Sequence, residues 1–260
     1  MGGRIGVEHD GGIGWLIFDQ PERRNAVSLE MWQTVPGAIA DLEADPEVRV
    51  IVVRGAGEDA FVAGADISQF EQNRVGDDAE LYDKATGAAH VALEGTDKPT
   101  IAMIHGPCVG GGMAIALTCD IRYADDRARF TIPAAKLGIG YGAPGIERLV
   151  QLVGPSVAKE IFFSAKLFDA STALRWGLVN EVLSPDALEA HVRDMAGRMA
   201  ANAPLTQRAV KMIVRDLQAP PERRDKAATD AAVQACFDSE DYREGIRAFL
   251  EKRPAAFRGR

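Results

Sequence analysis

Short runs of β-branched and other apolar residues punctuate the first half of the chain and predict buried strands. Three of these runs lie at residues 13–18, 48–54 and 100–104, and each is followed by turn or loop residues and then by apolar positions at helical spacing. Strands that alternate with helices in this way are typical of α/β proteins. The pattern therefore predicts an α/β fold.

The clearest helix of this half follows Ser28, a residue type that caps helix N-termini well. Apolar side chains then return at roughly helical spacing, at Met31, Trp32, Val35, Ile39 and Leu42. We expect a helix through about residue 42 whose apolar face packs against the core.

After residue 149 the pattern becomes almost wholly helical. It predicts helices at residues 155–164, 169–176, 186–201, 204–217 and 222–252, with a break near Asp238 in the last, and one strand at residues 178–183. Neither a low-complexity linker nor a repeat with a period of roughly 20 to 50 residues is present. We expect an α/β core over residues 1–200 and a helical C-terminal extension over residues 201–260.

Composition and charge narrow the class of protein. The chain has 260 residues, of which 47% are hydrophobic and 26% are charged, so it can bury a sizeable globular core. Its net charge is −8 at pH 7, and no block of Lys and Arg offsets that charge. Because a nucleic acid would be repelled over most of such a surface, we expect no nucleic-acid partner.

Cysteine and histidine spacing indicates no covalent or metal framework. Cys108, Cys119 and Cys236 form no CxxC pair, and the four histidines lie far apart in the sequence. No stretch reaches the roughly 18 apolar residues of a membrane span, and residues 1–10 do not resemble a secretion signal. We expect a cytoplasmic protein with no metal site and no membrane partner.

Two small-residue segments carry the candidate chemistry. "GPCVGGGMAIALTCD", residues 106–120, places three glycines before a predicted helix, whose first N–H groups have no partner within the helix. A phosphate-binding loop normally supplies Lys or Ser/Thr after its glycines, and this chain has Met113, Ala114 and Ile115.

The second segment, "AFVAGADISQF" at residues 60–70, has Gly64 and Ala65 before an acidic helix start at Asp66. If the two segments converge, they supply a pair of N–H donors, which is what an oxyanion hole requires. The alternative is that the glycines only permit close helix packing.

These segments, together with "NAVSLEMW", "FTIPAAKLGI", "ALRWGLVNEV" and the tail "EGIRAFLEKRPAAFRGR", resemble the crotonase (enoyl-CoA hydratase/isomerase) superfamily in order and spacing along nearly the whole chain. The resemblance implies a crotonase-like ββα spiral with a helical C-terminal extension that serves in trimerisation. It also implies an acyl-CoA thioester substrate, no cofactor beyond the CoA of that substrate, and a homotrimer or a hexamer built of trimers.

The resemblance further implies roles for individual residues. In the family the thioester carbonyl lies between two backbone N–H groups, which map to Ala65 and Gly111. The residues that match CoA-binding positions are Arg23 and Arg24 in one loop, Ala63, Asp66 and Ile67 in a second, and Phe249 and Lys252 in the tail. In relatives the tail pair often completes the pocket of a neighbouring subunit, and the alternative for this pair is an ordinary amphipathic helix.

The chain departs from the family pattern where a hydratase needs its acids. A hydratase uses two glutamates to hold and activate water, and this chain has Ala114 and Ala134 at those positions. Tyr141 matches a position used for catalysis in relatives with other activities, one of them a decarboxylase, although those decarboxylases carry a histidine where this chain has Ala65. Tyr141 is therefore the candidate catalytic side chain, with simple packing as its alternative.

Several reactions fit these features. A lyase such as a decarboxylase needs the oxyanion hole but no base to form an enolate. The alternatives are a genuine enoyl-CoA hydratase that uses other groups, an acyl-CoA thioesterase or ring-forming enzyme, and a weakly active CoA-ester binding protein. Other acids that match positions near the site are Glu147, Asp66, which we expect to cap a helix, and Asp120, which we expect to tie the loop after the glycine helix.

Overall fold

A six-stranded sheet forms the centre of the protein. The computed structural model describes residues 2–66 and 77–260. Strand β1 pairs antiparallel with β2, and the remaining neighbours pair in parallel. In spatial order the strands are β1 (Arg4–Asp10), β2 (Ile13–Asp19), β3 (Val50–Gly55), β4 (Thr100–Ile104), β6 (Ile121–Asp125) and β9 (Glu181–Leu183).

A smaller three-stranded sheet lies beside the first and carries the chain toward the glycine turn. Its strands are β5 (Pro107–Val109), β7 (Arg129–Thr131) and β8 (Phe168–Asp169). Strand β5 begins three residues after β4 ends, so the predicted direct step from strand to helix contains an additional short strand.

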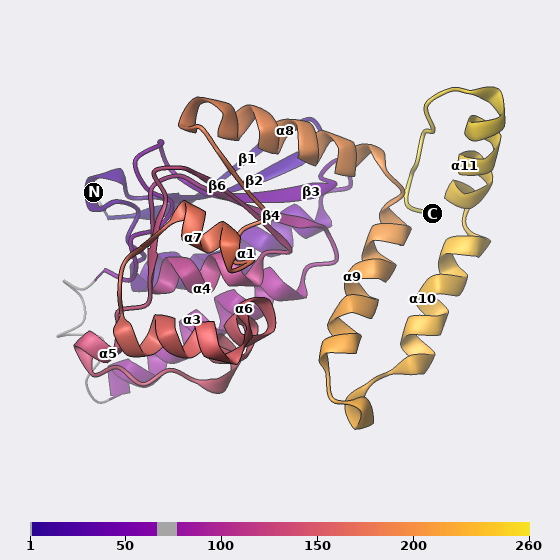
Figure 1. The fold of residues 1–260 in the computed structure, drawn as a ribbon. Helices are drawn as coiled ribbons and strands as arrows, with labels where there is room; N and C mark the ends of the chain where they lie inside the picture. Colours follow the sequence, from indigo (N-terminus) through magenta and orange to yellow (C-terminus); the bar gives the residue numbers. More distant parts are fainter. Residues whose placement is uncertain (1, 67–76) are drawn as a thin grey trace.

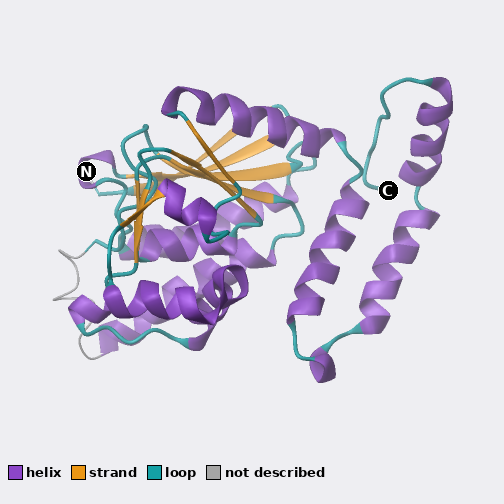
Figure 2. Cartoon of the chain, in the orientation of Figure 1, coloured by secondary structure: helices purple, strands orange, loops and turns teal. Residues whose placement is uncertain are grey.

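Helices cover both faces of the central sheet because side chains alternate along each strand. Val50 and Val52 pack with one set of residues against α8 (Pro185–Ala201), whereas Ile51 and Val53 belong to the cluster on the other face. That second cluster includes α1 (Leu29–Ala44), α3 (Asp77–Gly95) and α4 (Gly111–Thr118). Figures 1 and 2 show this layered body.

The remaining helices complete the body and the C-terminal region. Helix α6 bends at Gly154, whose φ is 76° and which precedes Pro155. Figure 1 shows α9, α10 and α11 standing beside the layered body. The bounds are α5 (Ala134–Leu137), α6 (Ala143–Ser164), α7 (Ala170–Arg175), α9 (Pro204–Gln218), α10 (Lys226–Asp238) and α11 (Glu240–Glu251), with single 3₁₀ turns at Pro21–Arg23 and Pro221–Arg223.

Most of the predicted elements are present, and the α/β class is confirmed. The helix capped by Ser28 forms, with the Ser28 hydroxyl accepting from the Met31 N–H. The predicted break in the last helix occurs at Ser239, which ends α10 and caps α11. Among the helices of the described residues, none is long and apolar enough to cross a membrane.

Two predicted boundaries were wrong. The strand predicted at residues 178–183 is shorter and forms only β9, at Glu181–Leu183. Leu178 and Val179 pack into the core, and Asn180 bonds to the main chain of Arg122 just before the strand begins. The helix predicted at residues 155–164 is the second half of α6, which starts earlier and continues across the bend.

A buried carboxylate fixes the turn that leads from β4 to the glycine segment. Asp125, fully buried at the end of β6, has Oδ2 3.0 Å from Nδ1 of His105, and its Oδ1 accepts from the Gly106 N–H. The Arg127 guanidinium donates to the same carboxylate. Burial alone would raise the pKa of this carboxyl, but the hydrogen bonds from His105, Gly106 and Arg127 outweigh it and hold the pKa below its ordinary value of 3.8.

Asp125→Asn should therefore destabilise the protein by roughly 2–3 kcal/mol at pH 7, because the substitution leaves buried donors without an ionised acceptor. A carboxyl whose pKa is lowered in the folded state contributes stability above its unfolded pKa and loses it as pH falls through the folded value. The difference in unfolding free energy from wild type should thus shrink below about pH 3.8. Urea denaturation at several pH values measures this, with the exposed neighbour substituted in Asp126→Asn as the control. A gap that stayed constant down to pH 3 would contradict the assignment.

Candidate functional site

The glycine turn brings the start of α4 close to the segment that contains Ala65. Gly110 precedes α4 with φ of 51° and ψ of −107°, a conformation that side chains rarely adopt. At Gly112 a Cβ atom would lie 2.2 Å from the Val62 carbonyl oxygen. Gly110 is therefore required for its backbone conformation. Gly112 is required because the Val62 carbonyl lies too close for a side chain.

Backbone hydrogen bonds hold residues 62–66 between two other segments. On one side, Val62 donates to Pro107 O over 3.2 Å and accepts from the Val109 N–H over 2.9 Å. On the other side, Val27 donates to Gly64 O and accepts from the Asp66 N–H. Val27 bonds to the groups on either side of Ala65, so the Ala65 N–H is not one of the groups that Val27 pairs with.

The predicted pair of donors is brought together. A Cβ placed on Gly111 would lie only 3.7 Å from the Ala65 nitrogen. Gly111 is the first residue of α4, and neither its N–H nor that of Ala65 donates a hydrogen bond within the described part of the chain. Two unpaired donors beside a helix N-terminus can hold an oxygen that gains negative charge.

A tryptophan forms one wall of this space. The Cζ2 atom of Trp32 lies 3.3 Å from the position of a Gly111 Cβ, and its indole N–H donates to the Tyr82 hydroxyl over 3.0 Å. From the sequence we placed Trp32 only in the core. Neither Trp32 nor Tyr82 was predicted to lie near the site. The available signal was the indole N–H, which requires a partner when it is buried.

His90 packs against the same tryptophan. Their ring centroids are 5.5 Å apart and nearly perpendicular. Burial lowers the pKa of His90 to about 4, and the nearby Arg148 adds to this effect. The imidazole is therefore neutral near pH 7, and its Nε2 is buried without a hydrogen-bond partner in the structure.

Ala114 and Ala134, which we expected at the positions of a hydratase's two glutamates, differ in their surroundings. Ala114 is partly exposed one helical turn after Gly111, so its methyl group lies on the same face of α4 as the donor pair. Ala134 is buried at the start of α5, 5% exposed, after Pro133. Neither side chain can transfer a proton.

The other acidic candidates are engaged elsewhere. Asp120 accepts from the main chain and hydroxyl of Thr100 and from Lys211 Nζ, which confirms that it ties the loop after α4. Asp66 pairs with Arg23 Nη1 at 2.6 Å. The helix start predicted at Asp66 falls on residues outside those the structure describes. Glu147 is exposed on α6.

Tyr141 lies in the loop between α5 and α6. Its ring packs edge-on against Phe162 of α6, with the ring centroids 5.1 Å apart. The side chain is partly buried against the main core cluster. The ring therefore has a packing role, and a catalytic role for the hydroxyl stays a prediction.

The residues predicted to bind CoA fall into two groups. The loops of Arg23, Arg24, Ala63 and Asp66 are joined directly, because the Ala63 N–H donates to Arg24 O and Asp66 binds Arg23. Ile67 lies outside the described residues.

The tail pair lies elsewhere. Phe249, 84% exposed, belongs to α11 and Lys252 caps it, and Figure 1 shows α11 at the right of the view, beyond α9 from the layered body. Within one chain the structure does not bring Phe249 and Lys252 to the other predicted CoA contacts.

Thiolate and metal chemistry find little support among the described residues. Burial raises the pKa of Cys119 to about 12 and raises that of Cys108 further, so both remain protonated thiols near neutral pH. No group of three or more His, Cys, Asp or Glu side chains is placed to hold a metal ion in residues 2–66 and 77–260.

Comparison with known proteins adds to this geometry. Residues 8–260 match the model of the enoyl-CoA hydratase/isomerase family. The chain is 34% identical over 252 residues to a crotonyl-CoA hydratase of Syntrophomonas wolfei, which covers 96% of each chain. It is also 34% identical over 249 residues to a carnitinyl-CoA dehydratase of Citrobacter koseri, which covers 94% of each chain.

Solved structures agree with these relatives. An enoyl-CoA hydratase/carnithine racemase from Magnetospirillum magneticum superimposes with a TM-score of 0.94 at 35% identity, over 98% of this chain and 96% of that one. This similarity confirms the crotonase-like fold that the sequence motifs predicted.

The packing of α4 on residues 62–66 can be tested separately from any activity. Gly112→Ala should lower the unfolding free energy by about 1–3 kcal/mol, because its Cβ would collide with a carbonyl oxygen that backbone bonds hold in place. Gly37→Ala, in α1 with open space around its Cβ, should instead raise stability by about 0.5–1 kcal/mol. Urea denaturation of both variants measures the difference, and equal effects would contradict the close approach.

Proposed function

The chain belongs to the enoyl-CoA hydratase/isomerase family, whose members act on CoA esters, and we propose that it stabilises a thioester enolate between the N–H groups of Ala65 and Gly111. The observation that carries the proposal is the pair of unbonded donors, with the Gly111 Cβ position 3.7 Å from the Ala65 nitrogen. Fixed donors in a site that excludes water stabilise developing negative charge without reorganising during the reaction.

The absence of carboxylates at residues 114 and 134 favours a reaction in which no side chain must remove a proton to form the enolate. Decarboxylation meets this condition. The bond between the α-carbon and the carboxylate breaks, its electron pair moves into the thioester carbonyl to form the enolate, and carbon dioxide leaves. A proton then adds to the α-carbon, and Tyr141 is the proposed donor. We therefore propose a lyase of the decarboxylase type.

Hydration is the second candidate, and the names of the relatives favour it. The Syntrophomonas relative is a crotonyl-CoA hydratase and the Citrobacter relative is a carnitinyl-CoA dehydratase. A hydratase with this sequence would have to position water without the two usual carboxylates. Neither reaction requires a cofactor beyond the CoA of the substrate, and we propose none.

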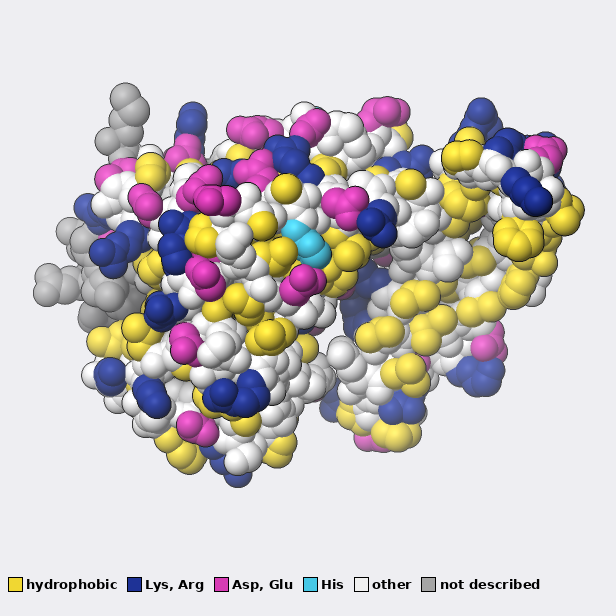
Figure 3. All heavy atoms as spheres, turned by 45° about the horizontal axis from the view of Figure 1, so that its top comes forward, with side chains coloured by type: hydrophobic (Ala, Val, Ile, Leu, Met, Phe, Trp, Pro, Cys, Tyr) yellow, Lys and Arg dark blue, Asp and Glu magenta, His cyan; other side chains and the backbone are white. Residues whose placement is uncertain are grey.

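We also propose that a second copy of the chain covers the C-terminal helices. Helices α9, α10 and α11 line an apolar groove of about 690 Å³. Large apolar side chains around it are exposed, including Leu250 at 74% and Phe237 at 54%. Figure 3 shows hydrophobic side chains gathered over these helices, on the right of the view. Because a monomer rarely exposes a large apolar patch, a homotrimer or hexamer fits this surface.

Substrate conversion separates the two candidate reactions. The purified wild-type protein should release carbon dioxide from methylmalonyl-CoA. It should hydrate crotonyl-CoA at least about a hundredfold more slowly than a double variant that carries both Ala114→Glu and Ala134→Glu. The reason is that hydration needs two positioned carboxylates, each contributing typically 10²–10⁴-fold as an acid or base. If the wild-type protein hydrates crotonyl-CoA efficiently, the decarboxylase proposal is wrong and the hydratase candidate is favoured.

The Gly111 donor can be removed with little change to the helix. Gly111→Pro should lower kcat by about 10²–10³ relative to Gly111→Ala, since both introduce a Cβ but only proline removes the N–H. Proline is well tolerated at the first position of a helix, where the N–H has no partner within the helix. The measurement is kcat for the best thioester substrate. Equal rates in the two variants would exclude this N–H from catalysis.

The proposed contact between copies predicts a change in mass. The wild-type protein should elute as a multiple of its 27.9 kDa chain mass, and the paired variant Leu250→Glu with Phe237→Glu should shift to a smaller species. Phe163→Glu, which changes an equally exposed apolar residue on α6, is the matched control. Size-exclusion chromatography with light scattering distinguishes these outcomes, and a monomeric wild type would contradict the proposal.

A further inference from the structure

A second cavity, of about 490 Å³, lies between the layered body and α9. Five helices contribute to its wall, among them α3 through Glu94, α4 through Leu117 and Thr118, and α6 through Arg148. Helix α9 closes it with side chains that include Lys211 and Arg215. The sequence interpretation did not anticipate this cavity, because its wall is assembled from distant parts of the chain.

Helix α4 connects this cavity with the donor pair. Gly111 begins the helix at the donor pair, and Thr118 ends it at the cavity, about 10 Å away at a rise of 1.5 Å per residue. Ala114 lies between them and is partly exposed, so only a methyl group projects from that turn of the helix.

Helix α3 runs in the same sense beside α4. The two helices pack against each other. His90 of α3 meets Trp32 next to the donor pair, and Glu94, one turn later, lines the cavity. A chain that reaches the cavity from the donor pair would have to run along these two helices.

The cavity wall carries more positive than negative charge. The cations are Arg122, Arg148, Lys211 and Arg215, and the acids are Glu94 and Asp120. Both acids already have cationic partners, since Asp120 binds Lys211 over 2.8 Å and Glu94 binds Arg148. The wall thus holds two more cations than acids within a chain whose net charge is −8.

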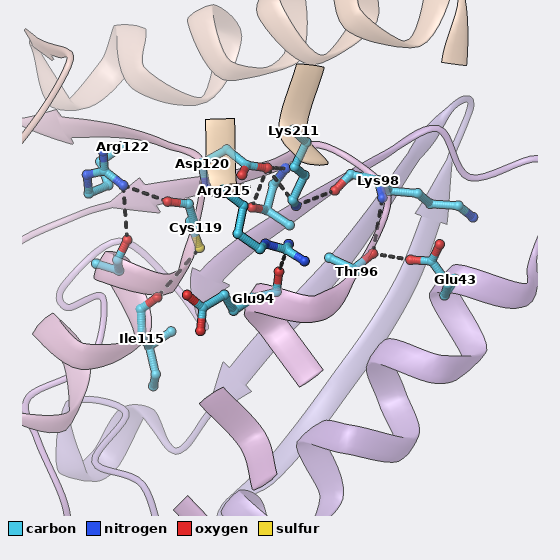
Figure 4. Close-up of polar contacts among 12 residues, drawn as sticks. Glu43, Glu94, Thr96, Lys98, Ile115, Cys119, Asp120, Arg122, Lys211 and Arg215 are labelled. Atoms are coloured by element: carbon cyan, nitrogen blue, oxygen red, sulfur yellow. Dashed lines mark hydrogen bonds and ion pairs between the residues drawn. The ribbon is translucent and has the colours of Figure 1, made fainter. Parts of the chain in front are cut away.

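The two cations without an ion pair bond to main-chain carbonyls. Arg122 is only 5% exposed and donates to the carbonyl oxygens of Leu178 and Cys119, over 2.8 and 2.6 Å. Arg215 donates to the main-chain oxygen of Glu94. Figure 4 shows Arg215 and Lys211 reaching from α9 toward the core, with Arg122 at the end of α4. A buried guanidinium without a carboxylate loses hydration that main-chain carbonyls replace only in part.

Donor groups in this wall also remain unfilled. The Nε of Arg148 is buried and has no hydrogen-bond partner in the structure. The Nη2 of Arg122 donates to no residue that the structure describes, because the bonds of this side chain come from Nε and Nη1. A carboxylate in the cavity has two oxygens that can accept from the guanidinium N–H groups that face it, whereas an alkyl end group accepts none.

We propose that this cavity binds a carboxylate at the far end of the acyl chain, so that the protein prefers the CoA thioesters of dicarboxylic acids to those of simple fatty acids. The inference rests on the proposed function, because it requires the thioester carbonyl to lie between Ala65 and Gly111. Arg148 and Arg215 supply the guanidinium groups that meet the carboxylate. The positive excess of the wall concentrates such anions in the cavity.

Isothermal titration calorimetry with matched thioesters tests this preference. The probes are octanoyl-CoA and suberyl-CoA, which differ only in the terminal group, together with the corresponding pairs of six and ten carbons. In at least one pair the dicarboxylic thioester should bind the whole protein about tenfold more tightly, the effect of roughly one charge-assisted hydrogen bond. Equal affinities at all three lengths, or a preference for the methyl end, would overturn the inference.

Variants locate the preference. Arg215→Gln and Arg148→Gln should each reduce the ratio of the two affinities at least threefold. Arg208→Gln removes an exposed charge of the same helix that pairs with Asp97 outside the cavity, and it should leave both affinities unchanged. Thermal melting checks that each variant is folded. Arg215 is exposed, so its variant keeps the test valid if Arg148→Gln unfolds. If the ratio of the two affinities is unchanged in both variants, the carboxylate binds elsewhere.

Further outcomes separate this inference from the proposed function. If no pair binds and methylmalonyl-CoA is not converted either, the proposed function fails; if no pair binds while methylmalonyl-CoA is still decarboxylated, only the carboxylate site fails. If the methyl-ended thioesters bind but the dicarboxylic ones bind no better, only the carboxylate site fails. Inorganic phosphate and free suberate serve as competitors. If either one binds without competing with octanoyl-CoA or suberyl-CoA, the cavity is a separate anion site and the inference is overturned.

Discussion

The close contact between Gly112 and the Val62 carbonyl is the constraint on which the candidate site depends. It lets the first turn of α4 approach residues 62–66 at a distance that no side chain would permit. The same residues are bonded to β5 on one side and to Val27 on the other. The Ala65 and Gly111 N–H groups are therefore held by the backbone itself, which is the most rigid way to fix two donors.

This arrangement separates two parts of catalysis that a hydratase combines. The donors that stabilise an enolate are backbone groups and remain whatever side chains surround them. Acids that move protons are side chains, and the alanines at residues 114 and 134 cannot serve in this way. A fold can thus keep a pair of backbone donors while the side chains around them change.

Charge is distributed in a way that the overall composition conceals. The chain is acidic as a whole, yet the cavity beyond α4 gathers cations from β6, α6 and α9. One of these cations, Arg122, is buried and relies on main-chain carbonyls instead of a carboxylate, which is a costly arrangement for buried charge. An acidic group on the substrate would complete it.

The sequence by itself determined the α/β class, the Ser28 cap and the break near Asp238, because these depend on local periodicity and caps. The family resemblance pointed to Ala65 and Gly111, which the structure brings close together. The sequence did not predict strand β1, whose side chains are largely exposed, or the true length of β9. Only the tertiary structure placed Trp32 against Gly111, joined Asp125 to His105 and assembled the basic cavity. Those contacts join residues 20 to more than 100 positions apart, and periodicity along a chain carries no information about which distant side chains will meet.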